Sequence, residues 1–100
     1  MAVTRVIRYT SKPERADENE GLIRAVFAEL AENHPEGIGY AALRLDDGVS
    51  FVHVVTLEGE NPLMASPAFA AFQAGIGDRC VEGPTPAEAT VIGSYGLPTA

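Results

Sequence analysis

The chain has 100 residues, of which 46% are apolar, and seven basic against fourteen acidic side chains give it a net charge of -7. This length allows one domain, residues 1–100, and excludes two independent cores. No stretch reaches the ~18 to 20 apolar residues of a membrane span, and the charge has the wrong sign for a phosphate backbone or an anionic membrane. We therefore expect neither nucleic acid nor a membrane as partner.

The N-terminus and the cysteine content predict a cytoplasmic protein. The first residues, Met1 to Val6, run straight into a strand-like pattern and lack the regions of a signal peptide. Cys80 is the only cysteine, so an intrachain disulfide cannot form, which agrees with a reducing compartment. We expect Cys80 to be a buried, unreactive thiol.

The first half of the chain predicts a strand, a helix and a hairpin. Residues 3–10 are rich in β-branched and aromatic side chains, and Pro13 follows them. Asp17 is placed as the N-cap of a helix, with Glu20 at the capping-box position, and the helix ends at residues 33–37. Residues 39–45 and 50–57 alternate like strands around a turn-forming segment, so they predict an antiparallel hairpin. The buried stripe of the helix is Leu22, Ile23, Val26, Phe27 and Leu30.

The second half predicts a short helical turn over residues 62–65, then a helix and a last strand. Ser66 followed by Pro67 is typical of a helix start, and Phe69, Phe72 and Ile76 form the apolar stripe of that helix. Residues 83–86 are expected to connect this helix to a strand over residues 89–95, and the tail that follows is expected to be coil.

This order of elements predicts an α+β, ferredoxin-like βαββαβ fold. It has a four-stranded antiparallel sheet with the first and third strands central and two helices on one face. Both faces of the third strand, residues 50–57, are largely apolar, so the face away from the helices also needs a cover. We expect a second copy of the chain there, giving a homodimer that forms a dimeric α+β barrel. The alternative cover is the C-terminal tail.

The segments 51–58 and 63–73, including the run Ser66-Pro67-Ala68-Phe69-Ala70-Ala71-Phe72, resemble the antibiotic biosynthesis monooxygenase family. Members of that family are dimeric α+β barrels that oxidise aromatic polyketides or quinols without metal or flavin, and some relatives cleave haem. The resemblance implies no cofactor and a small apolar or aromatic ligand in a cavity between sheet and helices. Leu57 stands where the family usually has a tryptophan, and the histidine often found before the Ser-Pro pair is absent, which argues against haem cleavage.

His53 is the candidate catalytic residue, because imidazole titrates near neutrality and can accept a proton from a phenol or quinol. It shares one face of its strand with Phe51 and Leu57, which are candidate ligand contacts. The resemblance places the tryptophan position in the shared interior, so we expect this face to turn toward the second copy. The alternative is an interior histidine hydrogen-bonded to a neighbour.

Tyr40, Arg44 and Arg8 are the remaining candidate ligand contacts. Tyr40 and Arg44 share a face of their strand, while the alternate residues Ala41, Leu43 and Leu45 are expected to face the helices. An arginine there can hold a carboxylate, enolate or phenolate, or else form a salt bridge at the dimer rim. Arg8 is assigned to the same interior because it lies on a central strand.

Three functions stay open at this point. The first is a dimeric barrel that binds a small apolar or aromatic molecule, with a monooxygenase-like activity that needs no cofactor. The second is a non-catalytic ligand-binding or stress-associated module of the same fold, and the third is a structural dimer with a solid interior. One cysteine and two distant histidines give no zinc spacing, so no metal site is expected.

Overall fold

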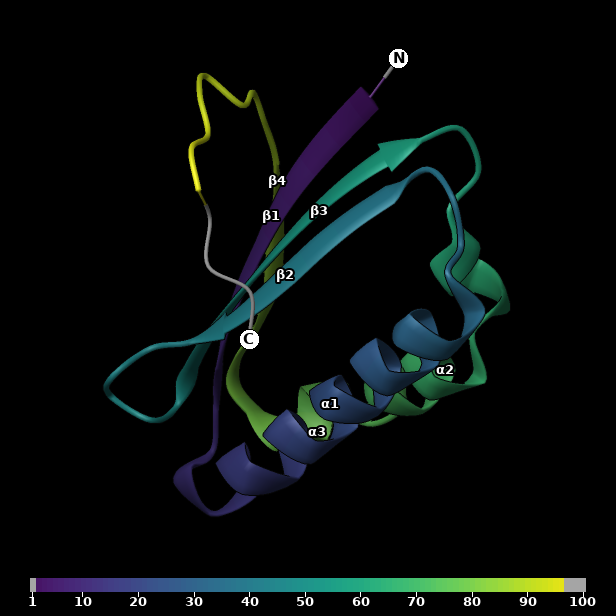
Figure 1. The fold of residues 1–100 in the computed structure, drawn as a ribbon. Helices are drawn as coiled ribbons and strands as arrows, with labels where there is room; N and C mark the ends of the chain where they lie inside the picture. The colour runs from purple at the N-terminus through teal and green to yellow at the C-terminus, as the bar shows by residue number, and fades with distance from the viewer. Residues whose placement is uncertain (1, 97–100) are drawn as a thin grey trace.

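The computed structural model describes residues 2–96 and has the predicted order of elements (Figure 1). The elements are β1 (Ala2–Ser11), a 3-10 turn (Pro13–Arg15), α1 (Ala16–Asn33), β2 (Ile38–Arg44), β3 (Ser50–Glu58), a second 3-10 turn (Pro62–Ala65), α2 (Pro67–Gln73), α3 (Ile76–Arg79) and β4 (Cys80–Ala89). Within residues 2–96, no helix is both long and apolar enough to cross a bilayer.

The four strands form one antiparallel sheet in the order β2-β3-β1-β4. The two central strands are therefore β1 and β3, as predicted. Figure 1 shows α1, α2 and α3 together on one side of this sheet. The ferredoxin-like α+β fold is confirmed, with two layers. The C-terminal tail, the alternative cover for the second sheet face, lies outside the described residues from 97 onward.

Helix α1 begins two residues earlier than predicted and without the predicted cap. Its N-cap position is Arg15, whose side chain makes no capping hydrogen bond, because a 3-10 turn leads directly into the helix. The carboxylates of Asp17 and Glu20 bind Arg44 of β2 instead. The predicted capping box is thus wrong, and the two acids connect the helix to the sheet.

Helix α2 begins as the sequence predicts. The Oγ atom of Ser66 accepts the N–H of Phe69 at 3.0 Å, and Pro67 occupies the first turn. The helix stops at Gln73 because Gly75 adopts a left-handed conformation with φ of 74°, and Ile76 then starts the separate helix α3.

The last strand was predicted too late in the chain. The sequence predicts it over residues 89–95, but β4 spans Cys80–Ala89 and contains Pro84 and Pro86. Since β4 is an edge strand, a proline that lacks an N–H can sit there without breaking a ladder hydrogen bond. Residues 90–96 form no strand and extend away from the helices (Figure 1).

The face of β3 that carries His53 turns toward the helices, which reverses the predicted orientation of the sheet. Phe51 and His53 are buried with Tyr9 of β1 beneath the helices. The alternate residues, predicted to pack under the helices, point outward, and Leu43 is 49% exposed. We call this outer surface the open face; its members include Val6, Arg8, Ala41, Leu43, Val52 and Val54.

Strand alternation could not decide between the two orientations, because both sides of β3 are apolar. The deciding contact comes from α1, where the buried Asn19 donates a hydrogen bond to the hydroxyl of Tyr9. This bond adds to the one between the same hydroxyl and His53 of β3, and it can form only when this face of β1 turns toward α1.

Candidate functional site

A cavity of about 250 Å³ lies between the sheet and α2. We call it the sheet–helix cavity. Most of its wall is apolar and comes from all four strands, the 3-10 turn before α2, α2 and α3. Arg5, Asn61 and Gln73 add polar side chains to this wall. The main apolar contributors are Val55, Leu57, Leu63, Phe69 and Phe72.

Three polar side chains meet at this cavity and bond to one another. The Nε2 atom of His53 lies 2.8 Å from the hydroxyl of Tyr9, and its Nδ1 atom lies 2.7 Å from the hydroxyl of Tyr40. All three residues line the cavity. Both ring nitrogens of His53 therefore already have a partner on a neighbouring strand.

Burial controls the protonation of this group. His53 is only 3% exposed, and its burial lowers the pKa of the imidazole to about 4. Burial raises the pKa of Tyr9 to about 12, partly opposed by its hydrogen bond from Asn19, and it also raises the pKa of Tyr40. At neutral pH the site holds a neutral imidazole between two neutral phenols.

The hydrogen bonds continue beyond Tyr9 to a buried arginine. The Nδ2 atom of Asn19 donates to the hydroxyl of Tyr9 at 2.9 Å, and Nε of Arg79 donates to Oδ1 of Asn19 at 3.1 Å. Arg79 is 2% exposed and also donates to the carbonyl oxygens of Phe72 and Ala74 at the end of α2. Among residues 2–96, its guanidinium has no carboxylate within ion-pair distance.

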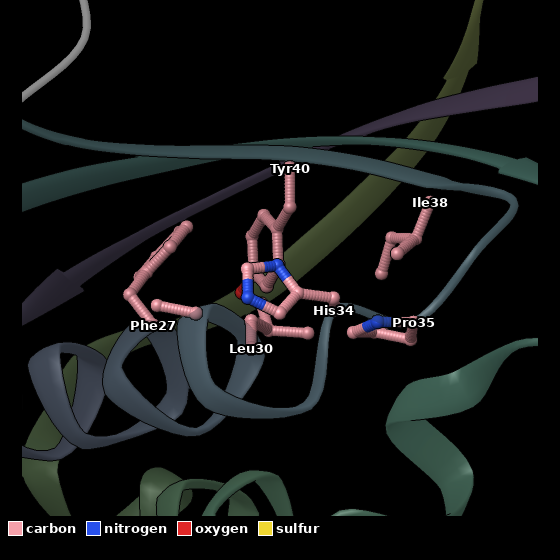
Figure 2. A pocket seen from close by; sticks show the side chains of 7 residues that line it. Phe27, Leu30, His34, Pro35, Ile38 and Tyr40 are labelled. Atoms are coloured by element: carbon pink, nitrogen blue, oxygen red, sulfur yellow. The ribbon is translucent and has the colours of Figure 1, made fainter.

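Tyr40 also borders a second, more open hollow of about 350 Å³, which we call the α1 groove. Figure 2 shows Tyr40 projecting from β2 toward the C-terminal turn of α1, between Phe27 and Ile38, with His34 beside it. The rings of Phe27 and Tyr40 are 4.8 Å apart. The phenol of Tyr40 thus belongs to the walls of both hollows.

The structure brings together three of the six predicted site residues. His53, Tyr40 and Leu57 line the sheet–helix cavity. Phe51 is buried just behind them and stacks on Tyr9, with ring centroids 5.4 Å apart. It supports the site from the core.

The two predicted arginines lie elsewhere. Arg44 bonds to the acids Asp17 and Glu20 of α1 at 3.1 and 2.8 Å, so it joins sheet to helix within one chain. Arg8 pairs with Val52 and is exposed on the open face, opposite to His53. The prediction that Arg8 and His53 share one interior is wrong. Ile7 pairs with His53 and shares its face, and Arg8, the next residue of β1, points to the opposite face.

Sequence reasoning missed Asn19 and Arg79. A signal for Asn19 exists, because it lies four residues before Ile23 and seven before Val26, on the buried stripe of α1. Arg79 carries no such signal, since only the fold brings it to Asn19, which lies 60 residues earlier.

The described residues offer no evident place for a metal ion. Within residues 2–96, no group of three His, Cys, Asp or Glu side chains gathers as ligands. Cys80 is buried as predicted, and its burial raises the pKa of the thiol. The chemistry available at the cavity is hydrogen bonding and proton exchange by imidazole and phenol groups, together with hydrogen-bond donation by the guanidinium of Arg5 on its wall.

Comparison with solved structures finds the same fold many times. The chain superimposes on Rv0793 from Mycobacterium tuberculosis with a TM-score of 0.73 and 15% identity, covering 96% of this chain and 100% of that one. It superimposes on SnoaB, a cofactor-independent oxygenase from Streptomyces nogalater, with a TM-score of 0.66 and 19% identity, covering 96% of this chain and 98% of that one. A structure described as an antibiotic biosynthesis monooxygenase gives a TM-score of 0.67 and 17% identity, covering 93% of this chain and 100% of that one.

These identities establish a shared fold and nothing finer. The fold-level resemblance to antibiotic biosynthesis monooxygenases is confirmed. No protein-family model matches the sequence, and no curated protein does.

Proposed function

We propose that the protein is a homodimeric barrel that binds a small, largely apolar aromatic molecule in the sheet–helix cavity. The observation that carries this proposal is an apolar cavity of about 250 Å³ with a hydrogen-bonding group at its wall. A dry apolar cavity of about 150 Å³ already holds benzene. The cavity here therefore suits one or two fused rings with a polar substituent directed at Tyr40 or His53.

The dimer is proposed because the open face is mostly apolar and no helix among residues 2–96 lies over it. Val52 and Val54 lie at its centre and Leu43 at one side. Ile92 and Tyr95, in the segment that follows β4, are both 99% exposed. A surface of this kind favours association, since burying it contributes about 25 cal/mol for each Å².

Binding without catalysis is favoured by the state of His53. A base with a pKa of about 4 is poorly matched to a phenol, whose pKa is about 10. Burial disfavours the charged imidazolium, so transfer of that proton to His53 is strongly uphill. Both ring nitrogens also already have partners, so His53 must lose one before it can accept a proton from a ligand.

Oxygenation without a cofactor is the second candidate function, and the fold shared with SnoaB, a cofactor-independent oxygenase, favours it. With a naphthol as substrate, one atom of O₂ enters the ring as a carbonyl oxygen and the other leaves as water, giving a quinone. In this candidate His53 is the catalytic residue that takes the phenolic proton. With 1-naphthol as the probe, the first candidate predicts binding without turnover and the second predicts oxidation to a quinone.

The binding test uses 1-naphthol and isothermal titration calorimetry. The variant Leu57→Trp places a larger side chain in the cavity wall, and we expect it to weaken binding at least about tenfold by filling the space. Ala25→Trp adds the same side chain on the exposed surface of α1 and should bind like the wild type. Equal affinities for the wild type and Leu57→Trp would exclude this cavity as the site.

The activity test measures oxygen uptake and naphthoquinone formation with the same probe. Binding without turnover supports the non-catalytic module. Turnover that disappears in a folded His53→Gln variant supports the oxygenase, with Ala25→Trp as the variant expected to keep full activity.

A further inference from the structure

The hydrogen bonds around the sheet–helix cavity have a defined direction, which begins at Arg79. A guanidinium group can only donate, so the atom of Asn19 that faces Arg79 must be the amide oxygen. The amide nitrogen then faces Tyr9 and donates to its hydroxyl oxygen. The two ends of the Asn19 side chain are thereby assigned by chemistry.

The direction continues through Tyr9 to His53. Because the oxygen of Tyr9 accepts from Asn19, its own proton is free to bond to Nε2 of His53, 2.8 Å away. A neutral imidazole carries one proton, which must then sit on Nδ1 and point to the hydroxyl oxygen of Tyr40, 2.7 Å away.

The opposite tautomer leaves a buried donor unpaired. If Nε2 carried the proton, the oxygen of Tyr9 would accept from both His53 and Asn19. The hydroxyl proton of Tyr9, which is 2% exposed, would then lose its bond to His53. Such a loss is costly in a core where every buried side-chain polar atom of the described residues otherwise has a partner.

Tyr40 is the end of this chain of bonds. Its oxygen accepts from His53, so its proton is not used by the chain, and its phenol lines the cavity. Burial raises the pKa of Tyr40, so the proton stays in place at neutral pH.

We propose that Tyr40 is a hydrogen-bond donor to the bound ligand, held in that role by Asn19 and Arg79, and that the cavity selects aromatic molecules carrying a carbonyl oxygen. This inference rests on the proposed function, since it specifies the ligand class of the same cavity. Asn19 and Arg79 are positioning residues, because they act on the ligand only through Tyr9, His53 and Tyr40.

One nearly isosteric substitution should reverse the chain. In Asn19→Asp the carboxylate only accepts, and the adjacent Arg79 keeps it ionised. The proton of Tyr9 then turns to the carboxylate, His53 donates from Nε2, and Tyr40 donates to Nδ1. The oxygen of Tyr40 is left to accept, so the cavity should now prefer a ligand with a donor.

The experiment compares three bicyclic probes of similar size by calorimetry: 1-indanone with a carbonyl acceptor, indole with an N–H donor, and indane with neither. For the wild type we expect 1-indanone to bind roughly five- to tenfold more tightly than indane, as for one added neutral hydrogen bond. Tyr40→Phe should abolish this difference, and Asn19→Asp should make indole the tightest of the three.

A two-bond ¹H–¹⁵N spectrum of the imidazole groups gives a readout that does not depend on ligand. The signals of His53 are assigned by their absence in His53→Gln, and the expected tautomer has its proton on Nδ1 in the wild type and on Nε2 in Asn19→Asp. An Nε2 proton in the wild type, or equal affinities for 1-indanone and indane, would overturn this inference alone. Failure of all three probes to bind would overturn the proposed function together with it.

Discussion

At the scale of single residues, the protein keeps His53 neutral by burial, and two tyrosine hydroxyl groups bond to its ring nitrogens. Burial lowers the pKa of His53 to about 4. The unfolded chain has a histidine pKa of about 6.5. Protonation of this group therefore favours unfolding.

The sign of this linkage predicts how stability depends on pH. The stabilisation from neutral His53 is complete above pH 6.5 and is lost as the pH falls from about 6.5 to about 4. A shift of this size corresponds to roughly 3 kcal/mol. Urea unfolding between pH 7 and pH 4 should show this extra loss in the wild type compared with His53→Gln, which retains all other titrating groups. Parallel pH profiles would contradict the assignment.

Arg79 is predicted to be required for stability although it has no carboxylate within ion-pair distance in residues 2–96. Arg79→Met removes the donors to the carbonyl oxygens of Phe72 and Ala74 and to Asn19. We expect a loss of about 3 kcal/mol or more in the free energy of unfolding, because each buried acceptor left unpaired costs about 1 to 3 kcal/mol. Arg79→Lys keeps the charge with fewer directed donors and should lose less. Equal stability of Arg79→Met and wild type in urea would contradict this role.

The sequence predicted which β3 side chains share a face, but not which layer covers that face. Strand alternation correctly groups Phe51, His53 and Leu57. Orientation depends on Asn19 and Arg79, which approach the site from α1 and α3 and are distant from His53 in the sequence. Local patterns therefore predicted part of the site, while the bonds that orient it depend on the tertiary fold.

At the scale of elements, the sequence predicted those whose signals are local. The hairpin of β2 and β3 and the start of α2 follow from turn residues and from the Ser66-Pro67 pair. The strand β4 was misplaced because Pro84 and Pro86 argue against a strand unless its position at the sheet edge is known.

Helix α2 forms part of the cavity wall, and its start is predicted to depend on Ser66. The hydroxyl of Ser66 accepts from the N–H of Phe69 and donates to Oε2 of Glu29 at 2.6 Å, so it joins the two helices. Ser66→Ala should lower the free energy of unfolding by about 1 to 2 kcal/mol. Thermal or urea unfolding measures this loss, and Ser66→Thr, which retains the hydroxyl, is the control expected to lose less. An unchanged stability in Ser66→Ala would contradict the capping role.

At the scale of the whole molecule, one sheet face is covered by helices and the other is the open face. The cavity lies on the covered side, and the proposed dimer contact lies on the other, only one strand thickness away. The two proposals are therefore separable by mutation, because neighbouring residues on β3 point to opposite sides.

The substitution Val54→Lys is predicted to separate the two copies without filling the cavity. Val54 lies on the open face opposite Val6, and a lysine there places a charge in the proposed contact. Light scattering should give the wild type a mass of twice the 10.5 kDa chain and the variant the mass of one chain. We expect the affinity between the two copies to fall at least about a hundredfold in the variant. Ala25→Lys adds the same charge on the outer surface of α1 and should stay dimeric. A wild type of single mass in dilute solution would contradict the dimer.

A crystal structure of the protein grown with 1-indanone would show whether the sheet–helix cavity is a ligand site. We expect density for the bicyclic ring against Leu57 and Phe69, with the carbonyl oxygen within hydrogen-bond distance of the hydroxyl of Tyr40. A cavity without ligand density at saturating concentration, or a ligand bound only on the open face, would contradict the proposed site.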